Sequence, residues 1–253
     1  MKHLVIPDCQ VKPDVDTEHL EHIGRYIVDK RPDVIVCIGD FADMPSLSSY
    51  DVGKKSFEGR RYKNDIEAVH EAMDRLLSPI RDLNRELARG HLRSYRPRKI
   101  LTLGNHENRI TRCVNSDPKL DGTISLDDLG YREFGWEVYP FLDVVVVDGV
   151  AYSHYFTTGV MGRPVTTASA LLTKKHMSCV MGHHQHDGVS SQYRADGKRI
   201  TGIFAGSCYT HEEDYLYQQG NQHWRGIWML NEVDEGTFDH MQVSLNFLRK
   251  KYG

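Results

Sequence analysis

Five short polar clusters, which follow one another in a fixed order along the chain, hold the side chains that could do chemistry. Carboxylates, amides and imidazoles are the groups that bind divalent metals and move protons in active sites. Taken singly, an Asp after an apolar run is usually a cap or turn residue, and a lone histidine more often belongs to the scaffold. The clusters are Asp8-Cys9-Gln10, Gly39-Asp40-Phe41-Ala42-Asp43, Gly104-Asn105-His106-Glu107, His154, and Gly182-His183-His184-Gln185-His186.

Three of the clusters follow short apolar runs, at residues 4–6, 34–38 and 100–103. Such runs are typical of buried strands whose carboxyl ends place polar side chains in loops. Between the first two runs, residues 17–30 carry apolar side chains at helical spacing. A strand, a helix and a strand in this order indicate parallel pairing, so the first half is predicted to be α/β.

The second half has the pattern of paired strands. Residues 144–147 and 150–154 flank Asp148-Gly149, which is a hairpin signal. We expect further strands at residues 178–181, 200–204, 226–233 and 243–247, and a helix at residues 166–174. The predicted architecture has two sheets packed face to face, helices outside them, and the strand-end loops gathered at one edge.

A long helix is predicted at residues 63–87, where apolar residues recur at spacings of three and four. This stripe either packs on the parent domain or forms a short coiled-coil seam. Pro79 lies inside it and is expected to kink or split the helix. Residues 85–99 are rich in Lys and Arg, and form either a solvated loop or a contact for a phosphate backbone.

Length and composition are those of one soluble domain, which we expect to span residues 1–253 with a helical and basic insertion at about 55–98. The formal net charge of −3 argues against a protein sheathed in basic residues for nucleic acid, while a local basic patch stays open. No apolar run approaches a membrane span and no signal-peptide pattern precedes the first strand, so we expect a cytoplasmic protein. Five dispersed cysteines without a CxxC pair are expected to be reduced and mostly buried.

In this order the five clusters resemble the calcineurin-like metallophosphoesterase superfamily, whose motifs are DxH, GDxxD, GNH[DE], H and GHxH. The resemblance covers about residues 4–207, and the two middle motifs match letter for letter. Phage-borne members look similar over most of the chain. The resemblance implies a four-layer αββα fold, an α/β class in which helices flank a two-sheet β-sandwich.

The resemblance also implies two divalent metal ions that activate a water between them. Their expected ligands are Asp8, Gln10 and Gln185 for the first metal, Asn105, His154 and His183 for the second, and Asp40 for both. Gln10 stands where the family usually has histidine, and an oxygen-rich set favours manganese, with magnesium, iron or zinc as alternatives. His106, paired with Asp43, would act on the leaving oxygen, and Glu107 would orient rather than ligate.

Two assignments stay open at this point. Aligning the last cluster on Gly182 makes His183 and Gln185 the ligands, whereas aligning on ligand quality makes them His184 and His186. Arg109 and Arg112 either bind the substrate phosphate or form surface salt bridges.

The expected function is that of a phosphodiesterase or nuclease acting on DNA, RNA or nucleotides. A phosphomonoesterase or protein phosphatase, and a metal-binding scaffold without activity, are the alternatives. Because all of these share fold and metal chemistry, the motifs leave the natural substrate open. The native metal and the oligomeric state are open as well.

Overall fold

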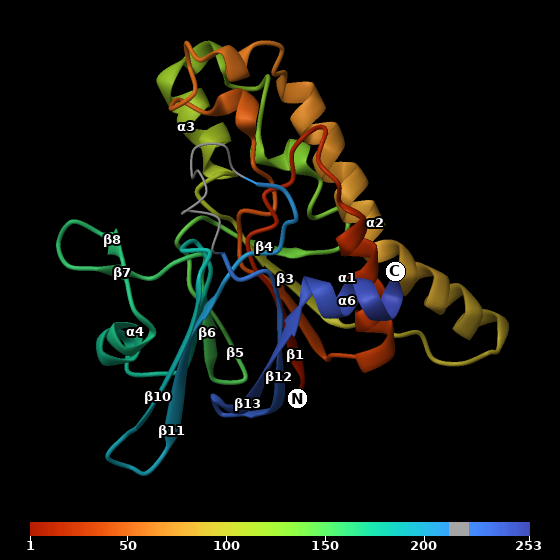
Figure 1. Cartoon of the computed structure of the whole chain (residues 1–253), viewed down its shortest axis with the longest axis vertical. Coiled ribbons are helices and arrows are strands. Elements are labelled where there is room, and N and C mark those ends of the chain that lie inside the picture. Colours follow the sequence, from red (N-terminus) through yellow and green to blue (C-terminus); the bar gives the residue numbers. More distant parts are fainter. Residues whose placement is uncertain (213–222) are drawn as a thin grey trace.

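Two β-sheets face each other in the computed structural model, which describes residues 1–212 and 223–253 (Figure 1). The larger sheet has the strand order β13–β12–β1–β2–β3–β4. Strands β1 to β4 run parallel, while β12 and β13 extend the sheet antiparallel to β1. Their bounds are β1 His3–Ile6, β2 Val34–Cys37, β3 Arg98–Thr102, β4 Glu137–Tyr139, β12 Gly226–Asp234 and β13 Thr237–Ser244.

The smaller sheet has the order β10–β11–β9–β6–β5, and a separate ribbon joins β7 to β8. The bounds are β5 Val145–Val147, β6 Val150–Tyr152, β7 Thr157–Thr158, β8 Arg163–Pro164, β9 Cys179–Met181, β10 Asp187–Tyr193 and β11 Arg199–Ala205. Alternate residues of the two sheets meet in one apolar layer, with Val36, Val180 and Trp228 among its fully buried members. This layer excludes water between the sheets and stabilises the sandwich.

Helices cover both outer faces (Figure 1). Helices α1 (Glu18–Lys30) and α2 (Tyr62–Arg89) lie on the larger sheet, α6 (Leu245–Tyr252) packs beside α1, and α4 (Ala168–Lys175) covers the smaller sheet. The predicted two-sheet sandwich flanked by helices is therefore confirmed. The remaining helical segments of the described residues are α3 (Asn108–Ser116) and the 3-10 turns η1 (Pro45–Leu47), η2 (Lys55–Phe57), η3 (Pro118–Leu120) and η4 (Leu126–Leu129).

Most predicted elements are present, and one was wrong. The strand expected at residues 243–247 ends at Ser244, whose hydroxyl accepts a hydrogen bond from the Phe247 amide and caps α6. Leu245 and Leu248 then lie three residues apart on the buried face of that helix. A Ser cap followed by this helical spacing outweighs the β-propensity of the run. Strand β10 was missed because its alternating half-exposed residues are mostly polar.

Helix α2 is continuous through Pro79, which corrects the expected kink or split. Proline cannot donate to the carbonyl four residues earlier, but the Ser78 hydroxyl donates to that group, the Arg75 carbonyl, at 3.0 Å. The Pro79 ring also packs where α1 comes close to α2, against Gly24. A side chain on Gly24 would collide with Pro79 and with the Leu76 carbonyl.

Gly24→Ala should therefore lower the free energy of unfolding by about 1–2 kcal/mol, although alanine normally favours a helix over glycine. The added methyl group would lie 2.8 Å from Pro79 Cγ, so α1 and α2 must separate. Urea denaturation of this variant measures the loss. Gly90→Ala is the matched control, because its methyl group would meet no atom closer than 3.6 Å. Equal stability of the two variants would contradict the close helix contact.

The basic stretch at residues 85–99 lies away from the strand ends that carry the polar clusters. It leads into the first residues of β3, roughly 20 Å along the chain from Asn105 at about 3.3 Å per residue. Arg98 forms an ion pair with Glu137 at 2.7 Å, and Lys99 donates to the Phe134 carbonyl. These contacts favour the solvated alternative over a phosphate contact.

The expectation of unpaired and mostly buried cysteines is confirmed. All five cysteines are free thiols, and four of them are buried, with Cys113 only half-buried. Among the helices of residues 1–212 and 223–253, none is long and apolar enough to cross a membrane.

Candidate metal centre

The five polar clusters converge at one edge of the sandwich. The carboxyl ends of β1, β2 and β3 meet there because these strands are parallel, and β6 and β9 bring two more loops from the facing sheet. Each loop supplies a side chain within three residues of its strand: Asp8, Asp40, Asn105, His154 and His183. Side chains far apart in the sequence are thus placed together by strand direction alone.

Asp40, His154 and His183 form a group that could hold a metal ion, since their ligand atoms lie within 4.8 Å of one another. Asp40 Oδ2 lies 3.3 Å from His154 Nε2. The oxygen of Asn105 lies 2.9 Å from both His154 Nε2 and His183 Nδ1. His154 Nδ1 donates to the Ile38 carbonyl, which turns its Nε2 toward the other members. Carboxylate, amide and imidazole atoms therefore converge as in a transition-metal site.

Asp8 is a fully buried carboxylate that accepts the His183 amide at 3.1 Å. Across residues 1–212 and 223–253, no Lys, Arg or His side chain forms an ion pair with it. Burial raises the pKa of Asp8 to about 7; the charge of His154 opposes this shift, and the nearby charge of Asp40 adds to it. A buried carboxylate that forms no ion pair, with only the charge of nearby His154 acting on it, fits a site that receives further positive charge from a metal ion.

The pKa of His154 is raised by its charged neighbours and not by burial. Burial alone would lower its pKa, but the charge and hydrogen bond of Asp40 and the charge of Asp8 raise that pKa to about 9. The same imidazolium charges, from His106 and His154, hold the pKa of Asp40 well below its usual range against the effect of burial. In the protein by itself, a protonated His154 thus supplies part of the positive charge that the two carboxylates require.

Several of the expected metal ligands share one strained backbone conformation. Gln10, Asp40, His183 and Gln185 all have left-handed conformations, with φ between 43° and 71°. Such conformations cost non-glycine residues about 1–3 kcal/mol each and are retained where the surroundings impose them. Four of the seven expected ligand positions share this geometry. These positions lie in sharp turns shortly after the strand ends.

Two glycines allow the carboxylates to lie against the backbone. A Cβ on Gly182 would collide with the Asp8 carboxylate, and a Cβ on Gly104 would collide with that of Asp40. Neither glycine can be displaced by one position without placing a side chain in that space. Gly182 therefore fixes the register of the histidine cluster against Asp8.

In that register His183 lies with the metal-binding group, whereas His184 and His186 do not. His184 Nε2 bonds to the Val165 carbonyl at 2.7 Å, and its ring stacks on Phe204 with centroids 5.2 Å apart. His186 also packs on Phe204, at 5.4 Å. The geometry favours the glycine alignment over the alignment on ligand quality.

The two glutamines lie at the same edge. The Gln10 amide donates to the Asp40 carbonyl at 2.8 Å, and the Gln10 side chain is buried. The Gln185 oxygen accepts a 2.6 Å hydrogen bond from the Tyr209 hydroxyl, which also bonds to His223 Nδ1. Tyr209 was not assigned a site role from sequence, because a tyrosine after the last motif carries no distinguishing pattern.

His106 and Asp43 form the expected pair beside the group. His106 Nδ1 donates to Asp43 Oδ1 at 2.7 Å, so Nε2 faces Asp40, 3.7 Å away. Burial opposes the charged imidazole, but Asp40 and Asp43 together raise the pKa of His106. Burial likewise opposes the charge of Asp43, yet His106, Lys12 and Arg109 lower the pKa of Asp43 to about 2. The pair is thus held with the imidazole proton directed into the site.

Arg109 differs from both sequence alternatives. Its guanidinium donates to the Asp43 carbonyl at 2.7 Å and to Asp43 Oδ1 at 3.2 Å, and it lies 3.4 Å from His106 Nε2. It is largely buried rather than a surface salt bridge. Arg112, one turn further along α3, is exposed.

Glu107 connects the loops after β2 and β3. This fully buried carboxylate accepts the amides of Asp40, Ala42 and Gly104 at 2.8–3.0 Å, and the Tyr131 hydroxyl at 3.2 Å. All four bonds are made within the protein, which agrees with the orienting role expected for Glu107. The participation of Tyr131 could not be read from the sequence.

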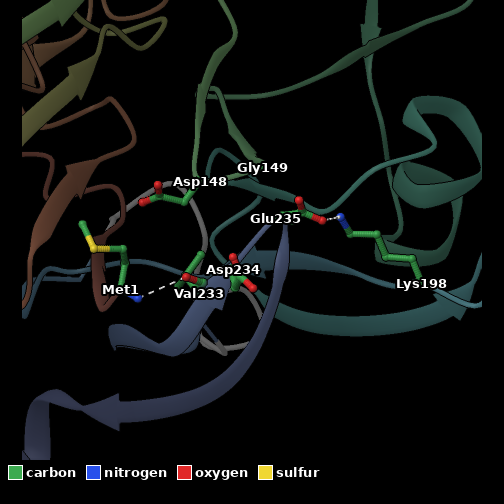
Figure 2. A pocket seen from close by; sticks show the side chains of 7 residues that line it. All are labelled: Met1, Asp148, Gly149, Lys198, Val233, Asp234 and Glu235. Carbon is green, nitrogen blue, oxygen red and sulfur yellow. Dashed lines mark hydrogen bonds and ion pairs between the residues drawn. The ribbon is translucent and has the colours of Figure 1, made fainter.

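A cavity of about 610 Å³ contains none of the five clusters (Figure 2). It lies beside the N-terminus, where Asp148, Asp234 and Glu235 line it. Glu235 is neutralised by Lys198 at 3.1 Å, and the Met1 amine donates to the Val233 carbonyl. This cavity is therefore separate from the metal-binding group.

Two proteins of similar sequence come from bacteriophages. No family model matches the sequence. The chain is 24% identical over 240 residues to the Gene 54 protein of Mycobacterium phage L5, which covers 91% of this chain and 88% of that protein. It is 37% identical over 78 residues to the Gene 54 protein of Mycobacterium phage D29, covering 31% and 29% respectively.

Two similar solved structures bear the names of phosphoesterases. Yfce, a phosphoesterase from E. coli, has a TM-score of 0.39 and 12% identity, covering 97% of this chain and all of that one. A conserved protein of Streptococcus pneumoniae TIGR4, a predicted phosphoesterase, has a TM-score of 0.35 and 11% identity, covering 96% and 99%.

Proposed function

We propose that this chain is a divalent-metal-dependent phosphoesterase. The observation that supports the proposal is the convergence of Asp8, Asp40, Asn105, His154 and His183 beside the His106–Asp43 pair. Divalent ions bound there would neutralise the substrate phosphate and lower the pKa of a water that attacks phosphorus. A phosphate ester is anionic, and a site of buried carboxylates alone would repel it.

The proposed ligand set divides between two ions. Asp40 would contact both, as the family resemblance implies. Asp8, Gln10 and Gln185 would hold the first ion, and Asn105, His154 and His183 the second. The first set contains only oxygen donors, which favours manganese or magnesium over zinc.

His106 is proposed to donate its Nε2 proton to the leaving oxygen. The hydrogen bond from Nδ1 to Asp43 fixes the ring, and Arg109 fixes Asp43 in turn. Asp40 and Asp43 favour the imidazolium that this role requires. Arg109 thus positions Asp43 and His106.

The proposed substrate is a phosphodiester of a nucleic acid or nucleotide. Residues 54–63 hold five basic residues and one acidic residue, and Phe57 of this segment lines a cavity together with Arg109. Such a local excess attracts a polyanion even though the whole chain has a net charge of −3. No feature of the described residues favours a phosphopeptide or a scaffold role.

One panel tests the proposal. Protein stripped of metal and then supplied with manganese, magnesium or zinc is offered a mononucleotide, bis-nitrophenyl phosphate and single-stranded DNA. We expect metal-dependent hydrolysis of both diesters, fastest with manganese. Release of phosphate from the mononucleotide alone would identify a monoesterase instead, and inactivity on all three substrates with every metal would remove the enzymatic proposal.

His106→Ala should lower turnover on single-stranded DNA by about 10²–10⁴-fold, because the alkoxide leaving group needs a proton. Bis-nitrophenyl phosphate should lose far less, since nitrophenolate leaves without one. Metal content, measured by mass spectrometry, should stay at the level of the unmodified protein. Equal losses on the two substrates would exclude His106 from the leaving-group role.

A further inference from the structure

A cavity of about 300 Å³ lies beside the proposed active site and is not part of it. The segment that contains η1 and η2 forms one wall, and α3 forms the other. The side chains that matter for its chemistry are Ser46, Tyr50, Phe57, Arg109 and Arg112. None of the expected metal ligands lines it.

Arg109 connects this cavity to the site. The same guanidinium that lines the cavity donates to Asp43 and lies 3.4 Å from His106 Nε2. His106 is the group proposed to protonate the leaving oxygen. The cavity therefore lies on the side to which the leaving part of the substrate departs.

The cavity is bordered by positive charge. Arg112 is exposed, and no acidic side chain in residues 1–212 and 223–253 forms an ion pair with it. Lys55 and Arg61, on the adjoining segment, are also exposed, and neither forms an ion pair with a described acidic residue. An unpaired guanidinium at the mouth of a cavity is suited to a phosphate group.

The cavity also has aromatic walls. Tyr50 is 80% exposed, and Phe57 lies beneath the Arg60 guanidinium at 5.6 Å. Val52, which also lines the cavity, is 68% exposed, so that Tyr50 and Val52 leave adjoining apolar surface there. Aromatic rings interleaved with cations are the pattern by which proteins bind single-stranded nucleic acid, stacking on bases and pairing with phosphates.

We infer that this cavity binds the nucleotide on the leaving side of the scissile phosphate in a single-stranded nucleic acid. Tyr50 stacks on the base, and Arg112 pairs with the next phosphate along the strand. The inference rests on the proposed function for the direction of the strand, but the binding surface itself consists of residues outside the metal-binding group.

The test measures binding and hydrolysis separately. Binding is followed by fluorescence anisotropy of a labelled single-stranded oligodeoxynucleotide in EDTA, where hydrolysis is blocked. Tyr50→Ala and Arg112→Gln should each weaken binding about tenfold. With manganese, each should raise KM for the same oligonucleotide while affecting bis-nitrophenyl phosphate far less, because that substrate is too small to span the cavity.

The matched controls are Tyr193→Ala and Arg96→Gln. Tyr193 is 76% exposed but opposes Arg199, at the end of the β10–β11 hairpin remote from the metal-binding group. Arg96 is an exposed arginine on the loop before β3. Both controls should bind the oligonucleotide as the unmodified protein does.

Each outcome supports or overturns the inference. Oligonucleotide binding that Tyr50→Ala and Arg112→Gln leave unchanged overturns it, and so does a loss that the controls share. Binding that depends on Tyr50 and Arg112 without hydrolysis of any diester keeps the inference and removes the proposed function. Hydrolysis of the small diester without oligonucleotide binding keeps the proposed function and overturns the inference.

Discussion

Asp40→Asn should lower phosphoesterase turnover by about a thousandfold or more and reduce the metal bound per chain. The substitution removes the negative charge at the position proposed to contact both ions, where Asp40 Oδ2 lies 3.3 Å from His154. Two cations would then repel each other without a carboxylate between them. Asparagine keeps the shape, tolerates the left-handed backbone of residue 40, and still accepts the His106 amide at Oδ1.

Asp14→Asn is the matched control for this experiment. Asp14 also has a left-handed backbone, with φ of 63°, but it is exposed and outside the metal-binding group. The control should keep both turnover and metal content, which mass spectrometry of the dialysed protein measures. Wild-type turnover and two ions per chain in Asp40→Asn would contradict the two-metal assignment.

His183→Ala should remove one metal ion and most of the activity, whereas His186→Ala should keep the metal and much of the rate. His183 lies within the metal-binding group and 2.9 Å from Asn105, while His186 packs on Phe204. His183 is half-buried and His186 is exposed, and because both belong to one cluster each serves as the control for the other. Because alanine at the left-handed position 183 costs about 1–2 kcal/mol, thermal unfolding is measured alongside.

The opposite result has a definite meaning. If His186→Ala loses the metal and His183→Ala keeps it, ligand quality and not Gly182 decides the alignment. A crystal soaked in manganese would then show His184 and His186 within bonding distance of the ions. That arrangement would require His184 to give up its bond to the Val165 carbonyl.

The sequence alone determined which side chains could meet and at which edge. Short apolar runs predicted β1, β2 and β3, and the parallel pairing of those strands requires their carboxyl ends, with Asp8, Asp40 and Asn105, to lie together. Helix α1 and the β5–β6 hairpin were equally readable, because periodicity and an Asp-Gly turn are local signals. Local patterns of this kind survive in the structure.

Only the tertiary structure decided contacts that join distant segments. The register of the histidine cluster depends on the space between Gly182 and the Asp8 carboxylate, 174 residues apart in the chain (182 − 8). The role of Arg109 depends on how close α3 lies to Asp43. Residues 85–99 lie away from the site because they lead into the start of β3, whose opposite end leads to Asn105. A sequence pattern records side-chain type and spacing, whereas these outcomes depend on packing distances between elements, which no local spacing contains.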